Sequence, residues 1–149
     1  MYTGYFARLN VYKKAGLTPV SVCLKAPDYY DGLEYKKLAP TWKILNEYKG
    51  GVYKGDKLHY TDEYVKQVIY TLYLPDVISD LEKLTNSNHD KIILLCWEKS
   101  DDFCHRNIIG CWMNANHFNC KEYEIWGHKK IWEYFDKLEK EGRLNELFK

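Results

Sequence analysis

The sequence KIILLCWEKSDDFCHR (residues 91–106) is the most informative stretch for the fold, because a continuous apolar run leads directly into a dense group of polar side chains. The run KIILLCW shows no alternation of polar and apolar residues, which is typical of a strand buried on both faces in a parallel sheet. The segment DDFCHR then predicts the start of a helix, with Asp101 or Asp102 at its cap. In open parallel sheets, ligands bind beyond the carboxyl end of such a strand.

Strand and helix patterns alternate on either side of this stretch. Residues 18–24 (TPVSVCL) and 122–126 (EYEIW) favour strands, and a short apolar start precedes Gly4. Apolar residues recur at helical spacing within residues 6–16, 61–73, 75–84, 102–118 and 129–142. Residues 27–42 are predicted as a surface loop, and residues 45–60 as a turn or small hairpin around their glycines. We therefore expect one three-layer α/β domain over residues 1–149, with a mainly parallel sheet flanked by helices.

The composition excludes several classes of protein. The 149 residues carry a net charge of +1, which supplies little attraction for nucleic acid. No stretch approaches the ~20 apolar residues of a membrane span, and the opening MYTGYFARLN lacks the pattern of a secretory signal. Five cysteines at irregular spacing favour free thiols in a reducing, cytoplasmic setting. The oligomeric state is left open.

Three predicted strand ends carry polar or conformationally special residues. Gly4 and Tyr5 follow the first strand, Lys25 follows the second, and Cys96 ends the central one. Because the carboxyl ends of parallel strands share one edge of the sheet, we expect these residues to line one site.

An anion pocket is the first interpretation of this site. Asp102 would cap the helix, whose free N–H groups and dipole favour an anion. Arg106 would bind a phosphate or carboxylate through two hydrogen bonds, and Lys25 would add a second positive charge. The alternative is structural: Asp102 caps the helix and Arg106 forms an ion pair with Glu98.

The two cysteines of the segment allow nucleophilic chemistry. A thiol near a helix start and next to His and Arg has a lowered pKa and is more reactive. Cys104 or Cys96 would then be the nucleophile, with His105 or Glu98 as the proton carrier. The alternative is that both cysteines are small residues that fill space beside a helix.

Metal binding is not expected, although Cys96, Cys104 and His105 are residue types that zinc prefers. Adjacent helical residues point about 100° apart, so Cys104 and His105 should diverge. The C-x7-C spacing is also unlike the usual zinc knuckle. We therefore predict no metal and no other cofactor.

Glu98 and the aromatic residues of the predicted loops extend the pocket hypothesis. Glu98 would accept hydrogen bonds from a sugar hydroxyl or base edge, or act as a general base; alternatively, it bonds loop amides at the sheet end. Aromatic residues in these loops would stack on a nucleobase, or else cover the sheet edge. They are Tyr5, Phe6, Tyr29, Tyr30, Tyr35 and Trp42.

At these residues the chain resembles the domain of unknown function 488 (DUF488) family. The shared signature is a buried strand, then Cys96-x-Glu98, a short acidic loop and Cys104-His105-Arg106 opening a helix. The resemblance runs from Tyr2 to about Asn114. It implies the α/β fold and a site at the end of the central strand.

Two segments depart from the pattern of the family. Many members carry Gly-His-Ser after the first strand, where this chain has Gly4-Tyr5-Phe6. Many carry Asp-Val-Arg at the second strand end, where this chain has Cys23-Leu24-Lys25. A mechanism that used the missing histidine and serine could not operate here.

The sequence thus predicts a protein that binds an anionic small molecule of the nucleotide type. Its pocket would comprise the loop from Cys96 to Arg106, Lys25, Gly4 and Tyr5, with Asp102, Tyr30 and Trp42 as further ligand-binding residues. It would act as a sensor or sequestering module. The alternative is a nucleotide- or nucleobase-directed hydrolase or transferase that uses Glu98, Cys96 or Cys104, and His105.

Overall fold

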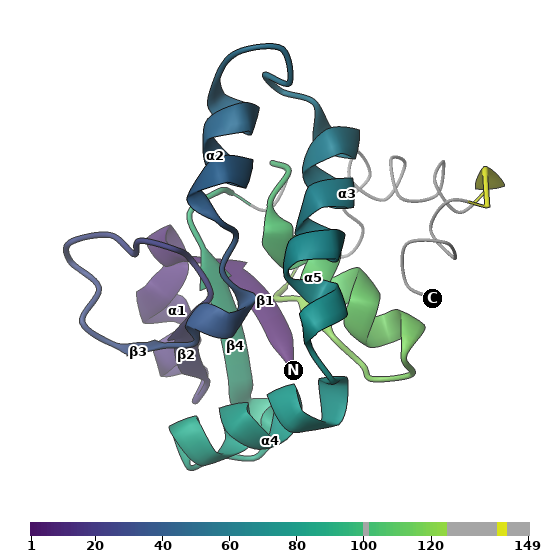
Figure 1. Ribbon diagram of the computed structural model, residues 1–149. Helices are drawn as coiled ribbons and strands as arrows, with labels where there is room; N and C mark the ends of the chain where they lie inside the picture. The colour runs from purple at the N-terminus through teal and green to yellow at the C-terminus, as the bar shows by residue number, and fades with distance from the viewer. Residues whose placement is uncertain (100–101, 125–139, 143–149) are drawn as a thin grey trace.

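The computed structural model describes residues 1–99, 102–124 and 140–142, and it confirms the α/β fold (Figure 1). Five parallel strands form one sheet in the order β3-β2-β4-β1-β5. The strands are β1 (Tyr2–Tyr5), β2 (Thr18–Ser21), β3 (Leu33–Glu34), β4 (Ile92–Cys96) and β5 (Lys121–Glu122). The α-helices are α1 (Leu9–Lys14), α2 (Trp42–Lys49), α3 (Lys57–Gln67), α4 (Leu74–Thr85) and α5 (His105–Ala115). Short 3-10 helices cover Phe6–Arg8, Lys36–Leu38, Ile69–Thr71 and His89–Lys91.

Strand β4 is the centre of the sheet, as its continuous apolar sequence predicts. All five of its residues are buried, and it pairs with β1 and β2. Its alternate side chains enter two separate cores, because successive residues of a strand point to opposite faces. Ile92 and Leu94 pack with apolar residues of α2, α3, α4 and α5, whereas Ile93 and Leu95 pack on the face covered by α1. The three-layer arrangement therefore follows from this one strand.

The segment predicted as a hairpin, residues 45–60, is instead helical at both ends. Helix α2 is capped by the Thr41 hydroxyl, which accepts a hydrogen bond from the Ile44 N–H, and α3 is capped by Asp56. The glycines lie only in the connection, where Gly51 and Gly55 have positive φ angles of 80° and 68°. The glycine-rich turn and the later part of α3 were therefore predicted, but α2 and the first turn of α3 were not.

Two further boundaries differ from the prediction. The predicted loop over residues 27–42 contains the short strand β3, which pairs with β2. Helix α5 begins at His105 rather than near Asp102, because Phe103 is buried against the rings of Tyr48 and Tyr60 before the helix starts. Among the described residues, no helix is both long and apolar enough to cross a membrane. The predicted helix over residues 129–142 lies outside the described residues except for 140–142.

Candidate functional site

A cavity of about 470 Å³ lies where β2 and β4 reach their carboxyl ends. Cys23 and Lys25 follow β2, Cys96 is the last residue of β4, and α2, α3 and the start of α5 supply the remaining walls. The position at the strand ends is the one that parallel sheets use for ligands. The lining residues are Cys23, Leu24, Lys25, Pro40, Trp42, Leu45, Tyr48, Lys49, Tyr60, Cys96, Trp97, Glu98, Phe103, Cys104 and His105.

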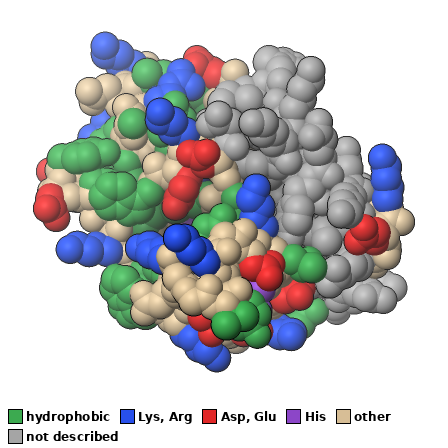
Figure 2. Space-filling model, turned by 90° about the horizontal axis from the view of Figure 1, so that it is seen from above, with side chains coloured by type: hydrophobic (Ala, Val, Ile, Leu, Met, Phe, Trp, Pro, Cys, Tyr) green, Lys and Arg blue, Asp and Glu red, His purple; other side chains and the backbone are tan. Residues whose placement is uncertain are grey.

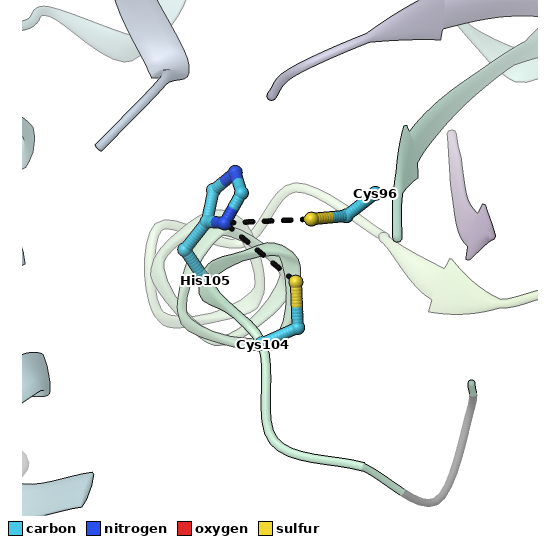
Figure 3. A group of neighbouring side chains, drawn as sticks. All are labelled: Cys96, Cys104 and His105. Atoms are coloured by element: carbon cyan, nitrogen blue, oxygen red, sulfur yellow. Dashed lines mark hydrogen bonds between the residues drawn. The ribbon is translucent and has the colours of Figure 1, made fainter. Parts of the chain in front are cut away.

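Cys96, Cys104 and His105 form a compact group (Figure 3). These buried residues line the cavity, and we call their part of the lining its floor. The Nδ1 atom of His105 lies 3.6 Å from the Sγ atoms of both cysteines. The two sulfurs and this nitrogen lie within 4.8 Å of one another. The three side chains are almost completely buried, so water reaches this group mainly through the cavity.

The expectation that Cys104 and His105 point apart is wrong. That expectation assumed that both residues are helical, but Cys104 is the N-cap of α5 and has an extended backbone (φ −153°, ψ 153°). The angle of about 100° between adjacent helical side chains does not apply to a residue outside the helix. Its side chain therefore turns back toward that of His105.

The ring of His105 is held by a hydrogen bond on its far side. Its Nε2 atom lies 2.7 Å from the carbonyl oxygen of Val22. A carbonyl oxygen can only accept, so Nε2 carries a hydrogen. In a neutral imidazole the lone pair is then on Nδ1, the atom that faces the two thiols. The contact with Val22 thus fixes the orientation of the ring and, when the ring is neutral, its tautomer.

The surroundings of Cys104 and His105 favour a thiolate beside an imidazolium. Burial opposes ionisation of Cys104, but the hydrogen bond with Cys96 and the positive charges of His105 and Arg106 outweigh it, so the pKa of the Cys104 thiol is lowered. For His105, burial acts to lower the pKa, but the negative charge of Cys104 raises it to about 9. Opposite charges held in one buried site favour each other's charged form.

The pKa values of Cys96 and Glu98 are raised, in contrast to that of Cys104. Burial, followed by the neighbouring Cys104 and Cys23, raises the pKa of the Cys96 thiol. Glu98 is exposed and lines the cavity, where partial loss of hydration, followed by the charge of Cys104, raises the pKa of its carboxyl to about 7. The Cys96 thiol donates a hydrogen bond to Oε2 of Glu98 at 3.2 Å. Glu98 therefore reaches the same floor from the end of β4.

Cys23 is a residue of the floor that sequence reasoning did not assign. Its Sγ atom lies 3.4 Å from that of Cys96. All five cysteines are free thiols, as expected. The position of Cys23 just after β2 was the sequence feature that could have identified it, because β2 and β4 are adjacent and their ends share one edge.

Arg106 lies elsewhere than predicted. It is fully buried, its Nε atom is 3.2 Å from Oε1 of Glu122 in β5, and one Nη atom donates to the Lys99 carbonyl oxygen. Its Nη1 atom has no hydrogen-bond partner among the described residues. Arg106 is also not among the described residues that line the cavity. The structural ion pair therefore forms with Glu122, and the role of Arg106 in ligand binding stays a prediction.

Six predicted site residues line the cavity and four others have different surroundings. Gly4 is packed so closely against Tyr12 that a Cβ atom there would lie 2.5 Å from the Tyr12 hydroxyl. The Tyr5 N–H donates to that hydroxyl, and the Tyr30 hydroxyl donates to the Leu33 carbonyl oxygen. The Asp102 carbonyl oxygen accepts a hydrogen bond from Asn107. The predicted residues that line the cavity are Lys25, Trp42, Cys96, Glu98, Cys104 and His105.

Aromatic side chains form part of the cavity walls. Trp42 and Trp97 are 57% and 53% exposed, so their rings remain available to a ligand. Tyr48 and Tyr60 also line it, but they lie in the segment mistaken for a hairpin, so sequence reasoning missed them. Trp97 is placed by its indole N–H, which donates to the Lys25 carbonyl oxygen at 2.7 Å.

The charges on one face of the molecule are mixed. In Figure 2, basic and acidic side chains lie interspersed with hydrophobic ones, rather than gathered into one basic surface. This distribution agrees with the net charge of +1.

The family comparison matches residues 14–117 to the family DUF488-N3a, described as the active DUF488-N3 subclade. The chain belongs to this family. The matched part of this DUF488-N3a protein includes β2, β4, the start of α5 and all residues of the cavity floor. Strands β1 and β5 lie outside the match. No curated protein and no solved structure matches the chain.

Proposed function

We propose that this DUF488-N3a protein is an enzyme that acts on a nucleotide-type small molecule bound in the cavity. One observation carries the proposal: a single cavity combines aromatic walls, two lysines and a floor of thiol, imidazole and carboxylate groups. Its volume of about 470 Å³ falls in the range of ordinary small-molecule sites.

The walls suit a flat ring that carries an anionic group. The exposed rings of Trp42 and Trp97 offer surfaces on which a nucleobase stacks. Lys25 and Lys49 also line the cavity, and an ammonium group binds phosphate as a point charge. The proposal therefore assigns the base to the aromatic walls and the phosphate to the two lysines.

The floor supports turnover rather than storage alone. Cys96, Cys104 and His105 form the reactive centre, and Glu98 lies beside them at hydrogen-bonding distance from Cys96. A carboxylate at hydrogen-bonding distance from a bound substrate acts as a proton carrier, and Glu98 lines the cavity proposed to hold that substrate. The description of the family as an active subclade also supports catalysis. We assign Glu98 as the general base of a hydrolytic or group-transfer reaction.

A second candidate is a binding module without turnover, acting as a sensor or sequestering protein. Its support is the end of β1, where Tyr5 and Phe6 replace the histidine and serine that many DUF488 proteins carry. Without these two residues, the chain has fewer groups able to move a proton.

A panel of nucleosides and nucleotides tests both candidates. Each compound is incubated with the full chain, binding is measured by calorimetry, and conversion is measured by liquid chromatography with mass spectrometry. The enzyme proposal predicts conversion of at least one compound, abolished by Glu98→Gln and unaffected by Lys43→Ala on the outer part of α2. Binding without conversion would support the sensor, whereas neither binding nor conversion would overturn both.

A further inference from the structure

We propose that Cys96, Cys104 and His105 bind one zinc ion on the cavity floor, with the fourth coordination position open to the cavity. The inference starts from the group of three ligand atoms within 4.8 Å of one another. It deepens the proposed function by assigning a metal to the same reactive centre, and it rests on that function only for the use of the metal in a reaction.

The two nitrogen-to-sulfur distances within the group match those of a tetrahedral zinc site. With Zn–S near 2.3 Å and Zn–N near 2.0–2.1 Å, tetrahedral angles separate a sulfur and a nitrogen ligand by about 3.6 Å. The Nδ1 atom of His105 lies 3.6 Å from the Sγ atom of Cys96 and 3.6 Å from that of Cys104. Both nitrogen-to-sulfur distances therefore fit an ion held between these atoms.

The ligand atoms also have the chemistry and the support that zinc requires. Two thiolates and an imidazole are a donor set typical of zinc, and the thiolates balance its charge. Zinc-bound histidines usually donate their other ring N–H to an oxygen, which orients the metal-binding nitrogen. The hydrogen bond from Nε2 of His105 to the Val22 carbonyl oxygen does this and leaves Nδ1 facing the thiols. Figure 3 shows this nitrogen directed at both sulfurs.

The position of the group indicates a site with an open fourth place. All three side chains line the cavity, so a ligand or water entering from it would complete the coordination. Zinc sites with three protein ligands and an open fourth position are typically catalytic. Oε2 of Glu98 lies 3.2 Å from Sγ of Cys96, and Glu98 lines the same cavity. A zinc held by the three residues would lower the pKa of a water bound to it, and Glu98 would be a carboxylate in the same cavity able to accept its proton.

Metal content and metal spectroscopy test the site without any nucleotide. The full chain is purified from zinc-supplemented cells under reducing conditions, and zinc is measured by inductively coupled plasma mass spectrometry. We expect about one zinc per chain, lost in Cys96→Ser and Cys104→Ser and kept in Cys111→Ser, a matched change on α5. Glu98→Gln should keep the zinc, because Glu98 is not a ligand. Wild type without zinc, or Cys104→Ser that retains it, would overturn the proposal.

Two measurements on the wild-type chain avoid reliance on variants that fold poorly. Cobalt added to the metal-free chain should give thiolate-to-metal charge-transfer bands, which shift when azide enters the fourth position. Zinc should also protect Cys96 and Cys104, but not Cys111, from iodoacetamide. Absence of the cobalt bands, or equal alkylation with and without zinc, would contradict the site. If the chain binds a nucleotide but holds no zinc, the zinc proposal is contradicted and the proposed nucleotide ligand is unaffected.

Discussion

His105 donates a hydrogen bond from Nε2 to the carbonyl oxygen of Val22 across 2.7 Å, which ties the first turn of α5 to the end of β2. The bond is buried, and it joins the two elements that carry the floor of the cavity. The orientation of the floor and the stability of the fold are therefore linked through one side chain.

Replacing His105 should affect both the stability of the fold and the chemistry of the cavity floor, and two variants separate these effects. His105→Ala leaves the Val22 carbonyl oxygen without its buried partner, which typically costs about 1–3 kcal/mol of unfolding free energy. His105→Gln retains an N–H donor and should recover part of that stability. Neither variant should bind zinc, because neither supplies an imidazole nitrogen. Urea unfolding measures the stability, and equal losses in the two variants would contradict the importance of this hydrogen bond.

Arg106 and Glu122 should show strong energetic coupling. Both side chains are almost fully buried, so removing the arginine takes away the guanidinium charge that faces the Glu122 carboxylate in the interior. Breaking a buried ion pair in this way typically costs about 3–5 kcal/mol. Arg106→Met should destabilise the chain by an amount in that range, and combining it with Glu122→Gln should restore part of the loss.

A ligand-binding role for Arg106 would give a different result. In that case Arg106→Met would keep most of its stability in urea unfolding but lose nucleotide binding. That outcome would support the prediction from the sequence, in which Arg106 contacts the anion directly.

Lys49 and Lys43 offer a matched comparison on one helix. Both are exposed residues of α2, but only Lys49 lines the cavity. Lys49→Ala should weaken nucleotide binding by roughly 1.5- to 5-fold, the effect expected for one exposed charge. The difference should shrink as salt is raised, because ions screen exposed charges. Calorimetry at two salt concentrations measures it, and an equal effect of Lys43→Ala would show that the lysine acts only through net charge.

Asp80 should make a contribution to stability that is lost in acid. Its carboxylate accepts hydrogen bonds from the Tyr35 hydroxyl at 2.7 Å and from the Lys37 ammonium at 3.1 Å, and these bonds lower its pKa from 3.8. A lowered folded-state pKa means that the stabilisation is fully present above the unfolded pKa near 3.8 and disappears as the pH falls through the folded value. Asp80→Asn should therefore lower the melting temperature at pH 7.

Thermal unfolding at acidic pH is the control for this prediction. Below the folded pKa of Asp80, wild type and Asp80→Asn should unfold at similar temperatures, because the carboxyl is then neutral in both states of the wild type. A difference in melting temperature that is the same at neutral and acidic pH would show that the carboxylate charge contributes nothing.

Strand β4 and the residues just beyond it could be predicted because the pattern that identifies them is contiguous in the sequence. The apolar run that forms β4 and the cysteines beyond it are contiguous in sequence, so their burial and their place at the strand end follow from one pattern. Lys25 was placed correctly by the rule that parallel strands share one carboxyl edge. The family signature fell within the matched residues 14–117.

The parts that could not be predicted depend on distant contacts. Glu122, the partner of Arg106, comes from β5, and its place beside β1 depends on the order of the strands. Phe103, next to Cys104, is buried against Tyr48 and Tyr60, which lie in the segment 45–60 that was predicted as a turn or small hairpin. For the same reason, the convergence of Cys104 and His105 could not be found from helical periodicity.

The nucleotide-type molecule proposed for the cavity at the ends of β2 and β4 should stay bound when the chain is gently purified from cells. Mass spectrometry of the small molecules that the purified chain releases would detect it. The matched sample is Leu45→Trp, a change that would fill the cavity from α2. We predict that wild type releases a nucleotide or its converted product and that Leu45→Trp, although folded, does not. Release of no such molecule by wild type, or equal amounts from both proteins, would contradict the account.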